Sequence, residues 1–221
     1  MIKETFIPSN RCASTPGEAW TRRPPTGGRL QYAAAAEFVR DNFPRREKQK
    51  CLVVGSPLFE AHEIQSMGWN VTYFDIRDPG DGGLNFVQGD ASAMPFDDES
   101  FDALSSTCVL SHVGTGRYGD SVVERGDEKA LAHMARVLKP GSLATIMFGN
   151  VAAMDNTVML GTCHRVYAIS DCRRMLAEAP FEIEKTSFWS YARRCWYDDE
   201  NGISKDLHGM PDYVSFLVRK C

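Results

Sequence analysis

The sequence predicts an α/β fold: a doubly wound, Rossmann-like sheet of mostly parallel strands. Short apolar runs alternate with segments of helical periodicity between residues 51 and 148, which indicates parallel strands joined by helical crossovers. Single glycines or aspartates close these runs, at positions where an open α/β sheet binds its ligand. The last two predicted strands have no helix between them and can pair as antiparallel neighbours.

The elements follow in order from periodicity and turn residues. Apolar residues recur at helical spacing over 30–43, and Pro44 ends that pattern. A helix over 170–178 is expected to begin with Ser170 as its cap. The other helices are predicted at 59–67 and 127–138, and the strands at 51–54, 71–74, 85–87, 101–105, 143–148, 181–188 and 213–218.

The chain divides into a short arm and one domain. Its 221 residues can bury one good core, which we place at 30–221. Residues 1–29 are rich in Pro and Gly with scattered Ser and Thr, so little regular structure is expected there. They form either a disordered tail or a flexible arm that folds over the mouth of the active site.

Composition excludes several classes of function. A net charge of −4 disfavours binding to duplex nucleic acid, because the basic surface that dominates such binding is missing. No apolar run approaches the length of a membrane span, and the N-terminus lacks the apolar core of a secretory signal, so a soluble cytoplasmic protein is expected. Seven cysteines without a CxxC pair indicate neither a disulfide framework nor a zinc site, and no dense acidic cluster indicates another metal.

The first two strand ends predict a nucleoside site. Gly55 closes the first strand, where the absence of a side chain lets the backbone pass close beneath a bound ligand. Asp75 closes the second strand 20 residues later, the separation at which an acidic side chain meets ribose hydroxyls. The glycine loop is poor, because Pro57 and Phe59 stand where further glycines are expected.

The third and fourth strand ends extend this site. Asp90 could accept a hydrogen bond from an adenine amino group, and Ala91 could supply a backbone donor to the ring. Either Ile76 or Arg77 could flank the adenine, although Arg77 is otherwise expected to be a solvated loop charge. Ser106, at the end of the fourth strand, is also assigned to this nucleoside-binding site.

The segment after the fourth strand is predicted to face the second substrate, which accepts the transferred group. His112 is the candidate general base because its ordinary pKa lies near neutrality; the alternative is a structural histidine beneath the loop. In the GRYGD loop, Arg117 could grip a carboxylate or phosphate and Tyr118 could stack on a ligand. Alternatively, Arg117 pairs with Asp120 and only holds the loop.

A long connection over 149–167 is expected to act as a lid or binding loop. His164, a second candidate base, with Arg165 and Tyr167, could line the acceptor pocket. The alternative is a loop packed by its own apolar residues, 158–160. The segment 191–211 could similarly cap the site or be a solvated excursion.

The strand end GDA with SFDALSS and VLKPG makes residues 50–150, and more loosely 150–219, resemble class I S-adenosylmethionine-dependent methyltransferases of the small-molecule type. The run SHVGTGRYGD with HRVY downstream is similar to a branch of methyltransferase-like domains. The resemblance implies a seven-stranded sheet with an antiparallel last strand, and S-adenosyl-L-methionine held at Gly55, Asp75, Asp90 and Ala91. Pro57 departs from the family at the methionine end of that pocket.

The expected function is therefore in-line methyl transfer to a small-molecule or glycan-type acceptor, with His112 as the base if an oxygen is methylated. A nicotinamide-dependent oxidoreductase is one alternative, although the chain lacks a full GxGxxG and a Tyr-x-x-x-Lys. A non-catalytic cofactor-binding or regulatory protein is another, favoured by the poor glycine loop. A third is a non-methylating use of the same cofactor.

Overall fold

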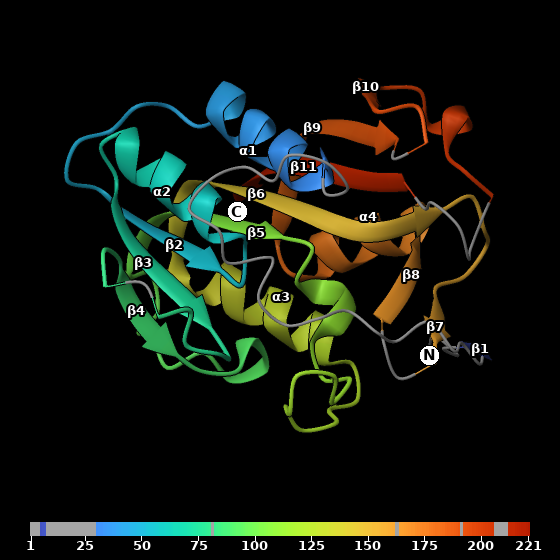
Figure 1. Ribbon diagram of the computed structural model, residues 1–221, viewed down its shortest axis with the longest axis horizontal. Coiled ribbons are helices and arrows are strands. Elements are labelled where there is room, and N and C mark those ends of the chain that lie inside the picture. The colour runs from blue at the N-terminus through green and yellow to red at the C-terminus, as the bar shows by residue number, and fades with distance from the viewer. Residues whose placement is uncertain (1–4, 8–29, 81, 162–163, 191, 206–211) are drawn as a thin grey trace.

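The computed structural model describes residues 5–7, 30–80, 82–161, 164–190, 192–205 and 212–221. Its central sheet has the strand order β4-β3-β2-β5-β6-β11-β9 (Figure 1). The first five of these strands are parallel, whereas β11 runs antiparallel to both β6 and β9. In sheet order the strands span Asn85–Gln88, Asn70–Asp75, Lys50–Val54, Phe101–Thr107, Leu138–Ala152, Asp212–Lys220 and Phe181–Ser190.

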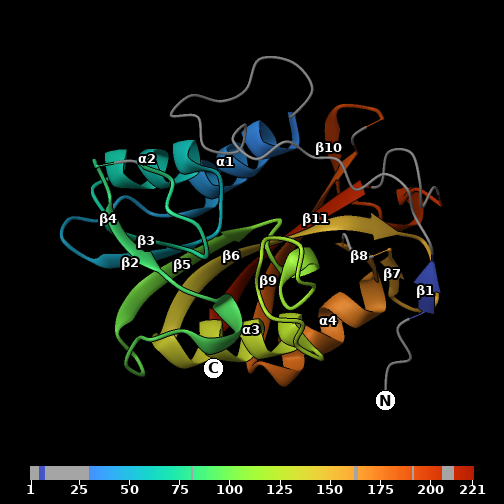
Figure 2. The same ribbon diagram turned by 60° about the horizontal axis from the view of Figure 1, so that its bottom comes forward.

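Helices cover both faces of the sheet. α1 (Leu30–Asn42) and α2 (Leu58–Ser66) lie on one face, and α3 (Gly126–Val137) and α4 (Ile169–Glu178) lie on the other (Figure 2). Buried apolar side chains form one cluster beneath α2 and a larger one beneath α3 and α4. The predicted doubly wound fold, with seven strands and an antiparallel last strand, is confirmed.

Two local predictions need correction. The strand predicted at 143–148 is longer in the structure, because β6 begins at Leu138, directly after α3. The KPG segment belongs to this strand, and the register of β6 with β5 shifts there. The predicted Ser170 cap is wrong: α4 starts at Ile169, Ala168 occupies the cap position, and no side chain caps it. β8 runs straight into this helix, so the cap position falls on the last strand residue. Asp171 supplies the negative charge that favours a first helical turn.

The connection after β6 is a packed hairpin and not an open lid. β7 (Val158–Leu160) pairs antiparallel with β8 (His164–Ala168), and β8 also joins the end of β6 in parallel. Val158, Leu160 and Val166 are buried together with Ala152, as expected for the alternative in which apolar residues pack this segment. The sequence missed both strands because each is very short.

Two further strands lie in segments for which no regular structure was expected. β1 (Thr5–Ile7) pairs in parallel with β7, so the expectation for 1–29 fails at these three residues; the rest of the arm is outside the described residues. β10 (Cys195–Tyr197) forms an antiparallel pair with β9. The capping role expected for 191–211 falls partly on residues that the structure does not describe.

The helices that the structure describes include none that is both long and apolar enough to cross a membrane. The cysteines in this part of the chain are all free thiols: Cys51, Cys108, Cys172, Cys195 and Cys221. Within the same residues, no group of three or more His, Cys, Asp or Glu side chains is arranged to hold a metal ion.

A buried carboxyl group joins α2 to the sheet. Glu60 is fully buried, and its Oε1 and Oε2 accept hydrogen bonds of 2.7 Å from the hydroxyls of Ser105 and Thr107 on β5. Thr145 on β6 in turn donates to the Ser105 hydroxyl at 2.9 Å. Burial raises the pKa of Glu60, and the hydroxyl donors act in the opposite direction.

We expect Glu60→Gln to change how stability depends on pH. Because the pKa of Glu60 is higher in the folded protein than in the unfolded chain (about 4.3), the wild type loses stability as pH rises from there through the folded-state pKa. Glutamine does not titrate. The difference in the free energy of unfolding, Glu60→Gln minus wild type, should therefore increase as pH rises from about 4.3 through the folded-state pKa, and it should be constant below that range. Urea denaturation between pH 4 and 8 measures this, and a constant difference contradicts it.

Glu60→Ala provides the matched comparison. It leaves the Ser105 and Thr107 hydroxyls without their acceptor, which should cost about 1–3 kcal/mol of stability at every pH tested.

Candidate functional site

A cavity opens at the carboxyl ends of β2, β3, β4 and β5. The volume of this cavity is about 110 Å³. This is the edge at which open α/β sheets bind ligands. Seven of the predicted site residues line it together: Gly55, Asp75, Ile76, Asp90, Ala91, His112 and Tyr118.

Two glycines shape the floor of the cavity. Gly55 has a φ of +56°, and a Cβ there would lie 2.8 Å from Cγ2 of Val109. A Cβ on Gly89 would lie 2.7 Å from the ring of Phe74. Both positions line the cavity, and the close packing of Val109 and Phe74 against them leaves no room for a side chain larger than that of glycine.

Asp75 presents a carboxyl group at the end of β3. Its side chain is 8% exposed, and Oδ1 accepts a hydrogen bond of 2.9 Å from the backbone N of Arg77. The Tyr73 hydroxyl lies 3.4 Å from Oδ2. Burial raises the pKa of Asp75, while the Arg77 amide and guanidinium act against that change. The group is thus oriented by its neighbours and faces the cavity.

Asp90 is fixed in the neighbouring strand end. It caps a short 3-10 turn, Ala91–Ala93, and its Oδ1 accepts hydrogen bonds of 2.8 Å from both the amide and the hydroxyl of Ser92. The carboxylate and Ala91 both belong to the cavity wall.

The poor glycine loop is replaced by a hydrogen-bonded turn. The Ser56 hydroxyl accepts a bond of 2.9 Å from the amide of Thr107, and Tyr73 donates its hydroxyl to the Ser56 carbonyl at 2.7 Å. Pro57 occupies the cap position of α2 and lines the cavity, whereas Phe59 is buried away from it. Hydrogen bonds from Tyr73 on β3 and Thr107 on β5 therefore fix this turn, in which further glycines were expected.

The segment after β5, predicted to face the acceptor, contributes His112 and Tyr118 to the cavity wall. His112 belongs to the 3-10 helix η3 (Leu110–His112), and its ring centroid is 5.5 Å from that of Tyr118. The guanidinium of Arg77 lies 4.0 Å from the centre of the Tyr118 ring. Arg77 is thus part of the cavity wall, and its interpretation as a solvated loop charge is wrong.

The GRYGD loop is held by its own aspartate. The carboxylate of Asp120 accepts hydrogen bonds from the backbone N atoms of Gly116 at 3.2 Å and Tyr118 at 3.0 Å. The guanidinium of Arg117 lies 5.4 Å from the Tyr118 ring centre. Asp120 and Tyr118 line the cavity, and Arg117 is not among the described residues that do.

His164 lies behind His112, with 6.0 Å between the ring centroids. Burial, followed by the charge of Arg117, lowers the pKa of His164 to about 4. Its imidazole is therefore neutral near pH 7 and is a weak base. Ser106 is buried within β5, and neither of these two residues is among the described residues that line the cavity.

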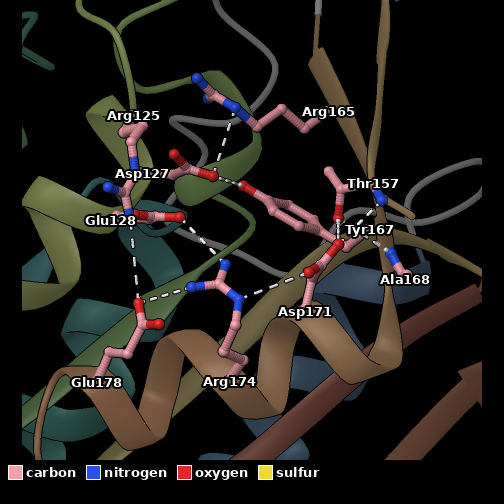
Figure 3. Close-up of polar contacts among 10 residues, drawn as sticks. All are labelled: Arg125, Asp127, Glu128, Thr157, Arg165, Tyr167, Ala168, Asp171, Arg174 and Glu178. Carbon is pink, nitrogen blue, oxygen red and sulfur yellow. Dashed lines mark hydrogen bonds and ion pairs between the residues drawn. The ribbon is translucent and has the colours of Figure 1, made fainter. Parts of the chain in front are cut away.

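Arg165 and Tyr167, expected at the acceptor pocket, instead form a buried network with Asp127 (Figure 3). The Nε of Arg165 lies 3.3 Å from Oδ2 of Asp127, and the Tyr167 hydroxyl donates to the same oxygen at 2.9 Å. Burial and the charge of Asp127 raise the pKa of Tyr167, which keeps its hydroxyl protonated. Sequence analysis missed Asp127 because an aspartate in a first helical turn is an ordinary feature.

Comparison by sequence finds similarity to methyltransferases in the central part of the chain. Residues 61–146 match a family model described as a methyltransferase domain. A demethylmenaquinone methyltransferase of Renibacterium salmoninarum is 31% identical over 121 residues, which are 53% of this chain and 44% of that protein. A ubiquinone/menaquinone biosynthesis C-methyltransferase of Idiomarina loihiensis is 37% identical over 73 residues, 33% and 25% of the two chains. The matches thus span less than half the length of these curated relatives.

Solved structures share the fold over most of the chain. A methyltransferase of Bacillus halodurans superimposes with a TM-score of 0.60 at 17% identity, covering 85% of this chain and 99% of the other. A 1,6-didemethyltoxoflavin-N1-methyltransferase of Burkholderia thailandensis, solved with S-adenosylhomocysteine, gives 0.60 at 15%, covering 90% and 92%. A 4+2 cyclase gives 0.64 at 17%, covering 91% and 85%. The expected class I methyltransferase fold is thereby confirmed, and the cyclase shows that the fold also serves other reactions.

We expect His164→Asn to flatten the acid side of the stability profile. The pKa of His164 is lower in the folded protein (about 4) than in the unfolded chain (about 6.5), so its contribution is complete above pH 6.5 and is lost as pH falls toward 4. Melting temperatures of wild type and His164→Asn should therefore converge as pH falls through this window. Parallel curves for the two proteins contradict the prediction.

Proposed function

We propose that this chain, whose residues 61–146 form a methyltransferase domain, is an S-adenosyl-L-methionine-dependent methyltransferase that acts on a small-molecule acceptor. The observation that carries the proposal is the cavity at the strand ends, where Gly55, Asp75 and Asp90 come together as a nucleoside site requires. The likeness to a methyltransferase of Burkholderia thailandensis solved with S-adenosylhomocysteine supports the same cofactor.

The wall residues fit the adenosine part of that cofactor. The carboxylate of Asp75 would hold the ribose diol, and Asp90 would accept a hydrogen bond from the adenine amino group; both residues line the cavity. The backbone N of Ala91 would donate to the adenine ring, and Ile76 would cover one face of that ring; these two residues also line the cavity. When bound, the cofactor supplies a sulfonium methyl group open to nucleophilic attack.

We assign the acceptor to the part of the cavity wall that follows β5. Val109 and Val113 are apolar and exclude water, and Tyr118 offers an aromatic face for a planar acceptor. For an oxygen acceptor, the His112 imidazole accepts the proton as the methyl group is transferred in line. His112 suits this role better than His164, whose low pKa makes it a weak base.

The acceptor class follows from the relatives and from the wall. The curated relatives are named for quinone substrates, and one structural neighbour for a fused heterocycle. A planar ring compound therefore suits the aromatic and apolar wall better than a glycan-type acceptor does. Arg117 remains the candidate contact for an anionic substituent, whereas Arg165 and Tyr167 are engaged inside the protein.

The sheet weighs against a nicotinamide-dependent oxidoreductase. A dinucleotide-binding sheet has six parallel strands in the order 3-2-1-4-5-6, whereas here the antiparallel β11 is inserted between β6 and β9. A non-catalytic cofactor-binding protein remains the alternative to turnover, and acceptor assays decide between the two.

Asp75→Ala should weaken binding of S-adenosylhomocysteine by about 10–100-fold, because the ribose loses a charged hydrogen-bond acceptor. Isothermal titration calorimetry measures the loss, and NAD should not bind to the wild type. Asp78→Ala is the matched control, because Asp78 is an exposed loop residue three positions away whose Oδ1 accepts from Gly80 N. Full affinity in Asp75→Ala would place the ribose elsewhere.

His112→Ala should lower kcat for an oxygen acceptor by about 100-fold or more, because the proton acceptor is lost. Affinity for S-adenosylhomocysteine should change much less than kcat. A panel of quinols and hydroxylated heteroaromatic compounds, with release of S-adenosylhomocysteine as the readout, tests both points. Normal turnover by His112→Ala removes this residue from the base role, and binding without turnover of any acceptor favours the non-catalytic alternative.

A further inference from the structure

The candidate base His112 lies on a very short element. The helix η3 spans only Leu110–His112, with no side-chain hydrogen bond at its cap. A single 3-10 turn cannot hold a side chain by its own backbone hydrogen bonds, so its orientation depends on contacts from other elements. Those contacts include the ring of Tyr118 and residues of β6, β8 and the beginning of α3.

Arg165 on β8 contacts the backbone on both sides of His112. Its Nη1 donates to the Val113 carbonyl at 2.8 Å and lies 3.4 Å from the Leu110 carbonyl oxygen. These carbonyls flank the part of the chain that carries the imidazole. The neighbouring His164 lies beside the His112 ring, so the same strand contacts both the backbone and the side chain of this turn.

The guanidinium is itself fixed by buried partners. The Arg165 side chain is 2% exposed and that of Asp127 is 6% exposed, and the Tyr167 hydroxyl donates to the same Asp127 oxygen that faces Arg165 (Figure 3). A buried charge must keep its partners, because each unpaired charge is costly to bury. Asp127 and Tyr167 therefore hold Arg165 in one position.

The beginning of α3 approaches the same turn closely. A Cβ on Gly126 would lie 2.9 Å from both the Gly114 Cα and the Val113 carbonyl oxygen. Asp127 follows Gly126 directly, so the residue that fixes Arg165 lies beside the backbone that Arg165 contacts. Strand, helix and turn are thus joined at one buried point.

We propose that Arg165 is a positioning residue: held by Asp127 and Tyr167, its guanidinium fixes the backbone around His112 so that the imidazole faces the cavity. This inference deepens the proposed function, since it gives the supporting structure of the proposed base. Arg165 thereby acts through the Val113 carbonyl and does not contact either substrate.

Arg165→Lys is the informative variant. Lysine keeps the charge beside Asp127 but lacks the planar fork that reaches a carboxylate and backbone carbonyls together. The turn should therefore shift while the buried charge stays paired. A displacement of about 1 Å can cost roughly 100-fold in rate, so we expect kcat to fall about 10–100-fold. KM for S-adenosyl-L-methionine should change less than threefold.

Arg174→Lys is the matched control in the same region (Figure 3). Arg174 pairs with Glu128 on α3 and with Asp171 and Glu178 on α4. The substitution is therefore chemically identical and also removes a guanidinium that pairs with the first turn of α3, but the ion pairs of Arg174 do not involve η3.

The experiment combines kinetics with NMR of the histidine imidazoles. The His112 signals are assigned by their loss in His112→Asn, and spectra are recorded with S-adenosylhomocysteine bound. We expect Arg165→Lys to shift the His112 signals and lower kcat, and Arg174→Lys to do neither. Unchanged His112 signals in a folded Arg165→Lys protein, or equal effects of the two lysine variants, would overturn the proposal.

If Arg165→Lys does not fold, Tyr167→Phe replaces it. This variant removes only the hydroxyl that donates to Asp127, and it should shift the same His112 signals with a smaller loss of kcat. Unchanged signals in Tyr167→Phe overturn the proposal in that case. Failure of the proposed function is distinguishable, because normal turnover by His112→Ala would remove the base role while the NMR signals still report whether Arg165 fixes the turn.

Discussion

The part of the cavity that we assign to the cofactor depends on one buried carboxyl group. Glu60 lies in the first turn of α2, yet its oxygens accept from Ser105 and Thr107 on β5. The amide of Thr107 in turn donates to Ser56, in the turn that would otherwise be rich in glycine. A polar side chain that is buried without hydrogen-bond partners is costly. The hydrogen bonds of Glu60 and Ser56 therefore fix α2, the end of β5 and this turn relative to one another. This hydrogen-bond network therefore fixes the turn at Ser56, where the expected glycines are absent.

The part of the cavity that we assign to the acceptor follows the same principle. Asp127, in the first turn of α3, pairs with Arg165 on β8 next to η3, as Glu60, in the first turn of α2, bonds to β5 next to the Ser56 turn. α2 and α3 lie on opposite faces of the sheet (Figure 2). Each network joins a helix to the end of a strand and supports one wall of the cavity. Buried charges restrict the arrangements in which a chain can pack, and this restriction is useful where a short turn carries a functional group.

The sequence predicted what depends on local pattern. Strand periodicity and the residues that close each strand located Gly55, Asp75 and Asp90 at one edge, because the carboxyl ends of parallel strands necessarily meet there. The hairpin of β7 and β8 was not predictable, because β7 has three residues and β8 has five, and β8 joins the sheet only through its pairing with the distant end of β6. Its residues were therefore assigned to a lid. The burial of the Arg165 side chain follows from the pairing of β8 with β6. The local sequence pattern contains no signal for that pairing.

The charges around the cavity favour a cationic cofactor over a dinucleotide. Asp75, Asp90 and Asp120 line the cavity, and Arg77 is the one cationic side chain among its described lining residues. A dinucleotide diphosphate normally binds at the amide groups of a helix N-terminus. Here Pro57 lacks an amide hydrogen, and Glu60 lies buried in the first turn of that helix. A sulfonium cofactor carries positive charge toward these carboxylates, whereas a diphosphate would bring negative charge to a helix end with reduced capacity to receive it. The departures from the glycine loop are thus compatible with S-adenosyl-L-methionine and unfavourable for NAD.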